Sequence, residues 1–407
     1  MTLADMFQRY ISKFQTIPIA WLQLKYQLTQ TIAGIVGILC ITFLLFMQLG
    51  LRNAFLEGAL QLPLSFDADI IVISSFSATA LQPVPFSSRP LYQALAIRDV
   101  ESVAPLYIAS TQWYDQEQSL YRIRVNTLGI PLNVPSINLP GVKENIQKLN
   151  KERFSLFDRN ARIEFKSIVN RFNTQGESLE RIRAGGENSL RELKVVGLFE
   201  LGVNNAYDAT FITNPTTFSQ LFNRSETSID IGLIRLKPGT NSDINIDKIV
   251  KILELYWPKS VRVLSKNELI KQERFFHENN SPIGFIFRFI LGMAVVVSIF
   301  ILYQIMYVKV TNNLGNYATL KALGFSHNTL ILIVIEEAII LGLVGYIPGI
   351  IVSSLAYNYL AEVTKIIIKM NLESLLTVFS LICIICLISA GLSLLKLKDA
   401  DPVDVFK

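Results

Sequence analysis

Four long runs of uncharged, mostly apolar residues constrain this chain more than any other feature. They occupy residues 31–51, 289–308, 338–360 and 375–395. A helix rises about 1.5 Å per residue, so each run can cross a hydrocarbon core of about 30 Å. The chain is 51% hydrophobic and only 17% charged, whereas soluble proteins average about 25% charged residues. The sequence therefore predicts an α-helical membrane protein with four transmembrane helices.

The spacing of these runs leaves one large segment, residues 52–281, between the first and second spans. Four spans place both termini on the same side of the membrane. Lys13 and Lys25 precede the first span, but basic residues also precede the second, so the positive-inside rule discriminates little. We expect cytoplasmic termini, an extracytoplasmic domain at 52–281, a short outer loop at 361–374 and a cytoplasmic tail at 396–407.

The N-terminal segment, residues 1–30, has an amphipathic pattern. Its apolar residues recur at helical spacing and would form one face of a helix. This face would lie either in the membrane interface or against neighbouring protein. Its members are Leu3, Met6, Phe7, Tyr10, Ile11 and Phe14.

The large segment predicts a mixed α+β domain. Residues 69–74, 194–199 and 231–236 are rich in β-branched residues and bounded by turn formers, as strands are. Residues 244–256 have helical spacing. Residues 143–193 are much more polar, and we interpret them as a solvent-exposed subdomain or insertion.

The end of this domain contains a helix-start signal. Ser265 followed by Glu268 has capping-box spacing, so we expect a stalk helix at about 266–281. The second span, placed at 282–308, begins with Pro282 and Gly284. A helix continuous with a span can carry a rigid-body movement across the membrane surface. The alternative is an ordinary terminal helix.

The loop between the second and third spans, residues 309–337, predicts one short helix that ends at Gly324, a favourable residue just beyond a helix C-terminus. In the first span, Gly34 and Gly37 would allow close helix approach at a dimer seam, or they are incidental, since glycine is common in membrane helices.

The sequence lacks the residues that several kinds of catalysis and ligand binding require. No glycine is followed by lysine, so a nucleotide-binding P-loop is missing. His277 and His327 are far apart, which disfavours a histidine-based zinc site or a catalytic triad. Arg288 and the Glu336–Glu337 pair stand at span edges, where we expect them to reach water or lipid headgroups. A net charge of +5 does not predict nucleic-acid binding. The chain is expected to bind no cofactor or metal. Any work that it performs must therefore draw its energy from another subunit.

The order of one span, a large domain and three closely spaced spans resembles FtsX/MacB-type ABC permeases. Within that group the chain is similar to DevC-type permeases, the membrane subunits of DevBCA-type exporters. The most specific blocks are Pro282-Ile-Gly-Phe-Ile-Phe287, Tyr317-Ala-Thr-Leu-Lys-Ala-Leu-Gly324 and Pro348-Gly349. Residues 18–24, 46–50, 68–70, 156–159, 195–202, 237–239 and 401–402 extend the likeness over nearly the whole chain.

The resemblance implies a non-catalytic permease, present as a homodimer in the inner (plasma) membrane. A separate DevA-type soluble ATPase would bind ATP, and a DevB-type membrane-fusion adaptor would lead to a TolC-like outer-membrane channel. The cargo implied is a lipid, particularly a glycolipid for the cell envelope of cyanobacteria. The short helix would couple to the ATPase through Asn316, Tyr317, Leu320, Lys321, Leu323 and Gly324.

One position departs from the family pattern: family members often have an acidic residue where this chain has Asn316. Two other functions share the same architecture. One is an FtsX-type regulator that activates an extracytoplasmic hydrolase, and the other is a lipoprotein-releasing permease. A stand-alone enzyme is disfavoured because no catalytic constellation is evident.

Overall fold

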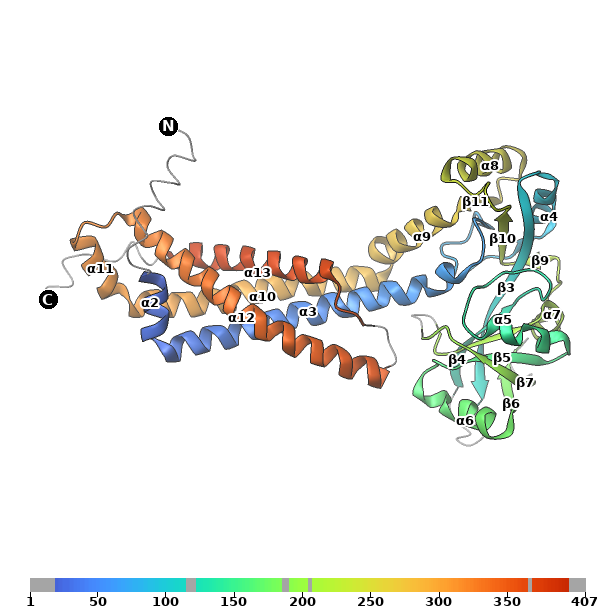
Figure 1. The fold of residues 1–407 in the computed structure, drawn as a ribbon, viewed down its shortest axis with the longest axis horizontal. Coiled ribbons are helices and arrows are strands. Elements are labelled where there is room, and N and C mark those ends of the chain that lie inside the picture. Colours follow the sequence, from blue (N-terminus) through green and yellow to red (C-terminus); the bar gives the residue numbers. More distant parts are fainter. Residues whose placement is uncertain (1–18, 115–121, 185–189, 204–206, 365–367, 395–407) are drawn as a thin grey trace. The chain divides into compact units, whose positions relative to one another are not determined.

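The computed structural model describes residues 19–114, 122–184, 190–203, 207–364 and 368–394. The chain forms two compact units. The first comprises Met1–Arg52, Ile286–Tyr359 and Ile368–Lys407, and the second comprises Asn53–Phe285 and Leu360–Ile367. The first is helical and the second contains the strands (Figure 1). The predicted class, four apolar helices with an α/β domain between the first and second, is confirmed.

Four helices are long and apolar enough to cross a membrane: α3 (Leu28–Ser65), α10 (Pro282–Asn312), α12 (His327–Thr364) and α13 (Leu372–Ser393). Two shorter helices, α2 (Ile19–Tyr26) and α11 (Leu314–Ala322), complete the described part of the helical unit. The first three predicted spans each fall within one long helix, and the fourth, 375–395, lies within α13 as far as Ser393. Helices α3, α10 and α12 exceed their uncharged runs because backbone hydrogen bonding continues through polar residues. The amphipathic face expected at residues 3–14 lies outside the described residues.

Glycines allow α3 and α12 to pack closely. A Cβ atom at Gly349 would lie 2.5 Å from the Cβ of Thr42, and one at Gly345 would lie 2.7 Å from the Cβ of Ile38. These distances are far below normal contact, so only glycine permits this approach. Small residues have this role in many membrane helix pairs.

Gly34 and Gly37 also face helices of the same chain. A Cβ atom at Gly37 would lie 2.6 Å from Cδ1 of Ile305 on α10, and one at Gly34 would lie 3.4 Å from the side chain of Leu341 on α12. The interpretation of these glycines as a dimer seam is therefore wrong, because the chain's own side chains occupy the space that they leave.

The second unit is built on a nine-stranded sheet with the order β11-β1-β10-β3-β4-β8-β5-β7-β6. The strands are β1 (Ile70–Ser74), β3 (Val100–Tyr114), β4 (Arg122–Gly129), β5 (Phe154–Asp158), β6 (Ser178–Arg183), β7 (Leu190–Phe199), β8 (Thr210–Thr213), β10 (Ile231–Leu236) and β11 (Val261–Ser265). A two-stranded sheet joins β2 (Phe86–Ser87) to β9 (Ser228–Ile229). The helices are α4 (Arg89–Gln93), α5 (Val142–Asn145), α6 (Lys166–Gln175), α7 (Pro215–Phe222), α8 (Asp243–Tyr256) and α9 (Lys266–Phe275). Three 3₁₀ turns (Ala94–Ala96, Ile146–Asn150 and Ile163–Phe165) and a π-helical turn (Phe276–Asn280) complete the described elements.

Strand β1 is buried on both faces, which explains its unbroken apolar sequence. Ile70 and Val72 pack into a core beneath α8, whereas Ile71 and Ile73 point into the core that includes the end of α3. Side chains alternate between the two faces of a strand, so one strand supplies both cores. The predicted strands at 69–74 and 231–236 and the predicted helix at 244–256 are confirmed by β1, β10 and α8.

Six strands close into a ring because the end of β3 pairs with β6 as well as β4. Residues Gln112–Tyr114 of β3 are antiparallel to Arg181–Arg183 of β6. One hydrophobic cluster receives a buried side chain from each strand of the ring: Trp113, Val125, Phe157, Ile182, Leu193 and Phe211. Closure removes the exposed edge that β6 would otherwise present.

The polar segment at 143–193 is not a solvated insertion, contrary to its interpretation from the sequence. It supplies β5, α6 and β6, and so part of the ring. Strand β6 alternates buried and exposed residues, so its charges lie mainly on the outer face. The buried carboxylate of Glu180 accepts hydrogen bonds from Trp113 Nε1 and Arg171, each at 2.8 Å. The segment is polar because one face of β6 is exposed to solvent and because the buried Glu180 carboxylate is hydrogen-bonded inside the ring.

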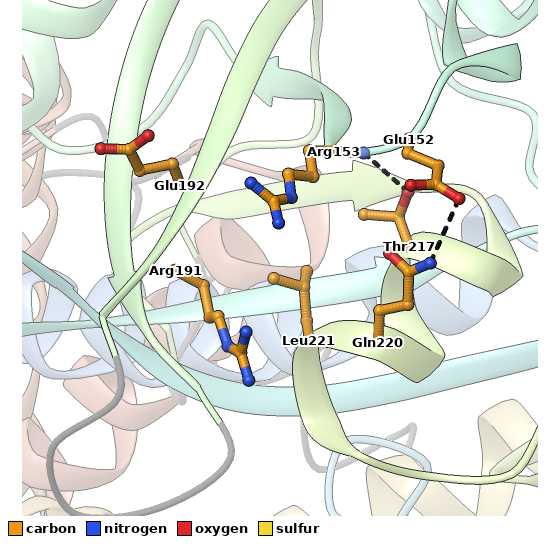
Figure 2. A pocket seen from close by; sticks show the side chains of 7 residues that line it. All are labelled: Glu152, Arg153, Arg191, Glu192, Thr217, Gln220 and Leu221. Atoms are coloured by element: carbon orange, nitrogen blue, oxygen red, sulfur yellow. Dashed lines mark hydrogen bonds between the residues drawn. The ribbon is translucent and has the colours of Figure 1, made fainter.

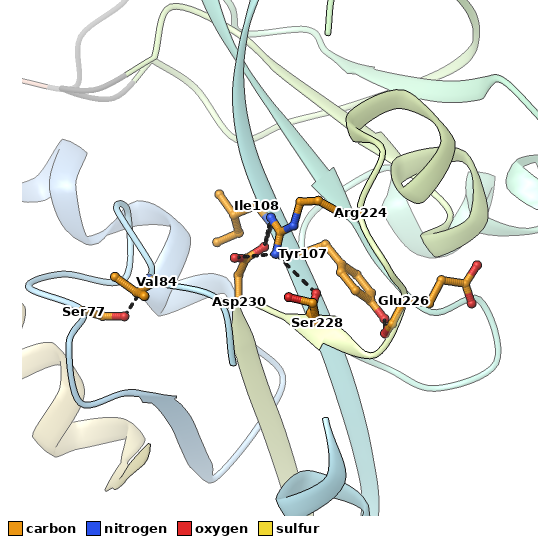
Figure 3. Close-up of polar contacts among 8 residues, drawn as sticks. All are labelled: Ser77, Val84, Tyr107, Ile108, Arg224, Glu226, Ser228 and Asp230. Carbon is orange, nitrogen blue, oxygen red and sulfur yellow. Dashed lines mark hydrogen bonds and ion pairs between the residues drawn. The ribbon is translucent and has the colours of Figure 1, made fainter. Parts of the chain in front are cut away.

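A second buried carboxylate fixes the chain that follows α7 (Figure 3). Both oxygens of Asp230 lie 3.0 Å from guanidinium nitrogens of Arg224, and Asp230 also accepts the backbone N–H of Ile108 at 2.7 Å. Tyr107 donates its hydroxyl to the Glu226 carbonyl at 2.6 Å. Burial raises the pKa of Asp230, and the Arg224 guanidinium opposes that rise. These contacts tie the chain that follows α7 to β3.

Asp158, at the end of β5, holds the loop after β7. Its fully buried carboxylate accepts the backbone N–H groups of Asn160, Leu201 and Gly202 at 3.0, 3.0 and 2.8 Å. Burial raises the pKa of Asp158 to about 6, although the three N–H donors oppose the rise. An unfolded aspartate has a pKa of about 3.9.

This raised pKa predicts a pH dependence. The folded state keeps the Asp158 proton at pH values where the unfolded chain has released it. The stability that protonated Asp158 contributes is therefore fully present below pH ~4 and is lost as pH rises through about 6. We expect the difference in unfolding free energy between wild type and Asp158→Asn to move by about 2–3 kcal/mol in favour of the variant from pH 4 to 7. Thermal unfolding of the full chain in detergent measures it. A pH-independent difference would contradict the assignment.

Candidate functional site

The short helix α11 joins α10 to α12 and ends in a Schellman motif. The N–H of Gly324 bonds to the carbonyl of Lys321 and the N–H of Phe325 to the carbonyl of Leu320, both at 3.1 Å. Gly324 has φ +94°, the left-handed conformation that this motif requires and that favours glycine. The predicted helix and its stop are thus confirmed.

Helix α11 has a buried face and an exposed apolar tip. Tyr317 and Ala318 are buried, Leu320 and Lys321 are half-buried, and Leu323 is 73% exposed. Phe325 also remains exposed just beyond the helix. Tyr317, expected to contact a partner, instead packs against the chain's own helices and can influence a partner only through its neighbours.

The most unusual contact in the helical unit is a buried ion pair between α10 and α12. Nζ of Lys309 lies 2.5 Å from Oε1 of Glu337, and their side chains are 1% and 0% exposed. Among the described residues, neither charged group has a hydrogen-bond partner beyond this contact. The single contact between the two groups therefore has to offset the cost of removing both charges from water. Loss of either group would leave the other buried without a partner.

Tyr317 connects α11 to this ion pair. Its hydroxyl is buried close enough to Glu337 and Gln23 to interact with both electrostatically. Burial and the negative charge of Glu337 raise the pKa of Tyr317. The phenol therefore stays neutral, so it presents a dipole to the ion pair.

Amide side chains connect the break between α2 and α3, where Gln27 lies, to the same region. Gln27 donates from Nε2 to Oδ1 of Asn313 at 2.6 Å, and Asn313 returns a bond from Nδ2 to Oε1 of Gln27 at 3.1 Å. Asn313 also bonds the Lys309 carbonyl and accepts from Asn316 Nδ2, both at 3.0 Å. Asn316 is thus a member of this network.

We call Gln23, Gln27, Lys309, Asn313, Asn316, Tyr317 and Glu337 the α11 cluster. Figure 1 shows α2, α11, the end of α10 and the start of α12 at one end of the helical unit. The cluster ties α11 to both flanking long helices through polar contacts rather than through apolar packing alone. A displacement of α11 therefore has a direct path to α10 and α12.

The expectation that Glu337 reaches water or headgroups is wrong. Glu337 lies within α12 and points at Lys309, because α11 reverses the chain between two consecutive long helices. The sequence did contain a signal for this pairing. Lys309 directly follows one uncharged run and Glu337 directly precedes the next, so antiparallel spans bring opposite charges to one level.

The predicted stalk junction is present but interrupted. Ser265 caps α9 by accepting the N–H of Glu268 at 3.2 Å. Helix α9 then passes into the π-helical turn and breaks at Ser281, which is extended at φ −83° and ψ 144°. The expectation of a helix continuous with the second span is therefore wrong. Ser281 starts α10 instead, because its Oγ accepts the N–H of Gly284 at 2.9 Å.

Gly284 permits the close approach of the π-helical turn to the first turn of α10. A Cβ atom there would lie 2.1 Å from the carbonyl oxygen of His277 and 2.6 Å from that of Glu278. Pro282 occupies the first turn of α10, where its missing N–H costs nothing. The junction residues named from the sequence thus form a sharp, fixed break.

The structure brings together no metal-binding set in the part of the chain that it describes. No group of three or more His, Cys, Asp or Glu side chains there could hold a metal ion. The α11 cluster contains one cation, one carboxylate, a phenol and amides, which can hold elements together or transmit displacement.

Residues 288–402 match the family model of the FtsX-like permease C-terminal domain. This stretch is FtsX-like. It includes Lys309, α11 and Glu337, and thus most of the α11 cluster. No curated protein sequence matches the chain.

Two solved structures are similar to part of the chain. The first is the periplasmic region of MacB from Actinobacillus actinomycetemcomitans, at 13% identity and a TM-score of 0.36, covering 53% of this chain and 95% of that one. The second is the extracellular domain of the noncanonic ABC-type transporter YknZ from Gram-positive bacteria, at 11% identity and a TM-score of 0.33, covering 49% and 99%.

Breaking the buried ion pair should destabilise the helical unit. We expect Lys309→Met or Glu337→Leu alone to cost about 3–5 kcal/mol, because each strands an uncompensated buried charge, whereas the double variant should be close to wild type. Thermal unfolding in detergent tests this, with the exposed Lys248→Met as the control. Additive losses in the double variant would show that the two groups do not depend on each other.

Adding a methyl group at the junction should also be costly. Gly284→Ala forces a Cβ atom against two carbonyl oxygens, so we expect a lower midpoint of thermal unfolding by several degrees. Gly292→Ala on the same helix meets no atom within 4 Å and is the matched control. Equal midpoints for the two variants would refute this geometry of the junction.

Proposed function

We propose that this chain is the permease subunit of an ABC transporter, driven by ATP that a separate subunit binds and hydrolyses. The observation that carries the proposal is the FtsX-like match over residues 288–402, the stretch that contains α11. The exposed tip of α11 supports it, since Leu323 and Phe325 form an apolar end next to a rigid cap. Such a tip is suited to a groove on a partner.

In this proposal α11 is the coupling helix. The ATPase would bind Leu323 and the half-buried Leu320, and closure of the ATPase would move α11. Because Tyr317 is buried beside Glu337, and Glu337 pairs with Lys309, this movement would pass to α12 and α10 together. The spans then transmit mechanical work, with no need for charges along an open pore.

The finer assignment is a DevC-type exporter subunit. It would form a homodimer in the inner membrane with cytoplasmic termini, so that α11 faces the cytoplasm and the α/β unit lies outside. Its partners would be a DevA-type ATPase, a DevB-type adaptor and a TolC-like channel, and its cargo a lipid or glycolipid. The sequence blocks at residues 282–287 and 317–324 support this assignment.

Gentle purification of the tagged chain from its native membrane, followed by identification of bound proteins, tests the proposal. We expect a nucleotide-binding ATPase together with a membrane-fusion adaptor. An ATPase with an extracytoplasmic hydrolase and no adaptor would favour an FtsX-type regulator. An ATPase with neither would favour a lipoprotein-releasing permease. No ATPase, under conditions that keep known ABC complexes intact, would overturn the proposal.

The tip of α11 provides a sharper prediction. Leu320→Asp combined with Leu323→Asp should reduce ATPase co-purification at least tenfold while the protein stays in the membrane, because carboxylates would be buried unpaired against the partner. The control is Leu179→Asp, which also replaces an exposed leucine, on β6. Unchanged co-purification would show that α11 is not the docking helix.

A further inference from the structure

The α/β unit contains a cavity of ≈ 350 Å³ between the ring strands and α7 (Figure 2). It is lined by Glu152, Arg153, Arg191, Glu192, Thr217, Gln220 and Leu221. These residues come from the chain before β5, the start of β7 and one face of α7. The volume is at the lower end of the range for small-molecule sites.

The charges that line this cavity are unevenly satisfied. Glu152 accepts from Nε2 of Gln220 at 3.3 Å, and Glu192 pairs with Nε of Arg181 at 3.2 Å. Among the residues that the structure describes, neither Arg153 nor Arg191 has an ion pair or a side-chain hydrogen bond. Glu192 is thus paired with a cation and Glu152 is bonded to a neutral amide, while the two exposed guanidinium groups remain available.

Arg153 adopts a conformation that its side chain does not favour. It has φ +62°, the left-handed region, which costs a non-glycine residue about 1–2 kcal/mol. Its backbone is held on both sides, since its N–H donates to Oγ1 of buried Thr217 at 3.1 Å and its carbonyl accepts from the N–H of Lys194 at 2.8 Å. Glycine would suit this backbone better, so Arg153→Gly should relieve strain at this position.

The surroundings of Arg153 add positive potential. The ammonium group of Lys151 lies 5.6 Å from the ring centroid of Phe154. That of Lys194, 5.7 Å from the same ring, is paired with Glu177 at 2.6 Å, so the added charge is that of Lys151. Figure 2 shows the two guanidinium groups beside Leu221, while Glu152, Thr217 and Gln220 are grouped together. The cavity therefore offers two planar cations, one apolar wall and one amide and hydroxyl edge.

We propose that this cavity binds a small organic anion through its phosphate or carboxylate oxygens, with Arg153 and Arg191 as the binding residues. Guanidinium groups bind such oxo-anions in bidentate geometry, and two of them from different elements fix the anion's position. Leu221 would contact an apolar part of the ligand. The proposal does not depend on the ATPase or on the role of α11.

The test is ligand-dependent thermal unfolding of the full chain in detergent, at ionic strength held constant with sodium chloride. The probes are sodium glutarate, glycerol 3-phosphate and short-chain dihexanoyl phosphatidate. We expect a saturable rise in the unfolding midpoint with at least one probe. Saturation by glutarate or glycerol 3-phosphate would assign the site to a free anion, whereas saturation by phosphatidate alone would assign it to a lipid headgroup.

Arg153→Gly makes the test decisive because the fold should tolerate it. We expect this variant to unfold at or above the wild-type midpoint and to bind the probe at least tenfold more weakly, as should Arg191→Gln. Asn223→Gly relieves a second left-handed non-glycine residue among those described, at φ 50°, and should bind normally. So should Arg159→Gln, which removes an exposed arginine that lies 3.7 Å from Glu200.

Two outcomes would overturn the proposal. One is the absence of a saturable shift with all three probes in the wild-type chain. The other is an unchanged shift when Arg153→Gly and Arg191→Gln are combined. Either result can occur while the ATPase still co-purifies, so this test and the test of the proposed function can fail separately.

Discussion

A single buried contact, between Lys309 and Glu337, determines how the helical unit can respond to a partner. Two charges in surroundings that exclude water have nowhere else to find compensation, so α10 and α12 cannot separate at this level without a large cost. Tyr317 lies against the same pair, and Asn313 and Asn316 connect this region to Gln27, between α2 and α3. The short helix between the spans is therefore mechanically part of them.

In the α/β unit, the closure of six strands into a ring fixes the positions of the surrounding elements. The length of β3 lets one strand serve an open sheet, through β10, and a closed ring, through β4 and β6. The ring gives β5, β7 and α7 fixed positions, and the Arg224–Asp230 pair anchors the chain that follows α7. The cavity with its two arginines is thus supported by rigid elements rather than by loops alone, as a binding site requires.

Much of the fold could be predicted from local pattern, because spans, buried strands and caps leave local signals. The apolar runs gave the four long helices, and Gly324 gave the end of α11. What failed depended on three-dimensional packing that residue type and spacing do not reveal. The polarity of residues 143–193 reflects a strand with one wet face, and the break at Ser281 depends on carbonyl oxygens packed against Gly284. The burial of Glu337 required knowing which charge α11 brings opposite to it. The cavity depended on the left-handed backbone of Arg153, which has no sequence signature.

Site-specific crosslinking from α11 tests the central claim most directly. A photoreactive amino acid at position 323, in the intact chain in its native membrane, reports what touches the exposed tip of the helix. The account predicts a crosslink to a nucleotide-binding ATPase subunit, and no such crosslink from position 179 on β6. Crosslinks from position 323 to lipid alone, or to proteins without a nucleotide-binding domain, would contradict it, because α11 would then lie on the membrane surface or serve another partner.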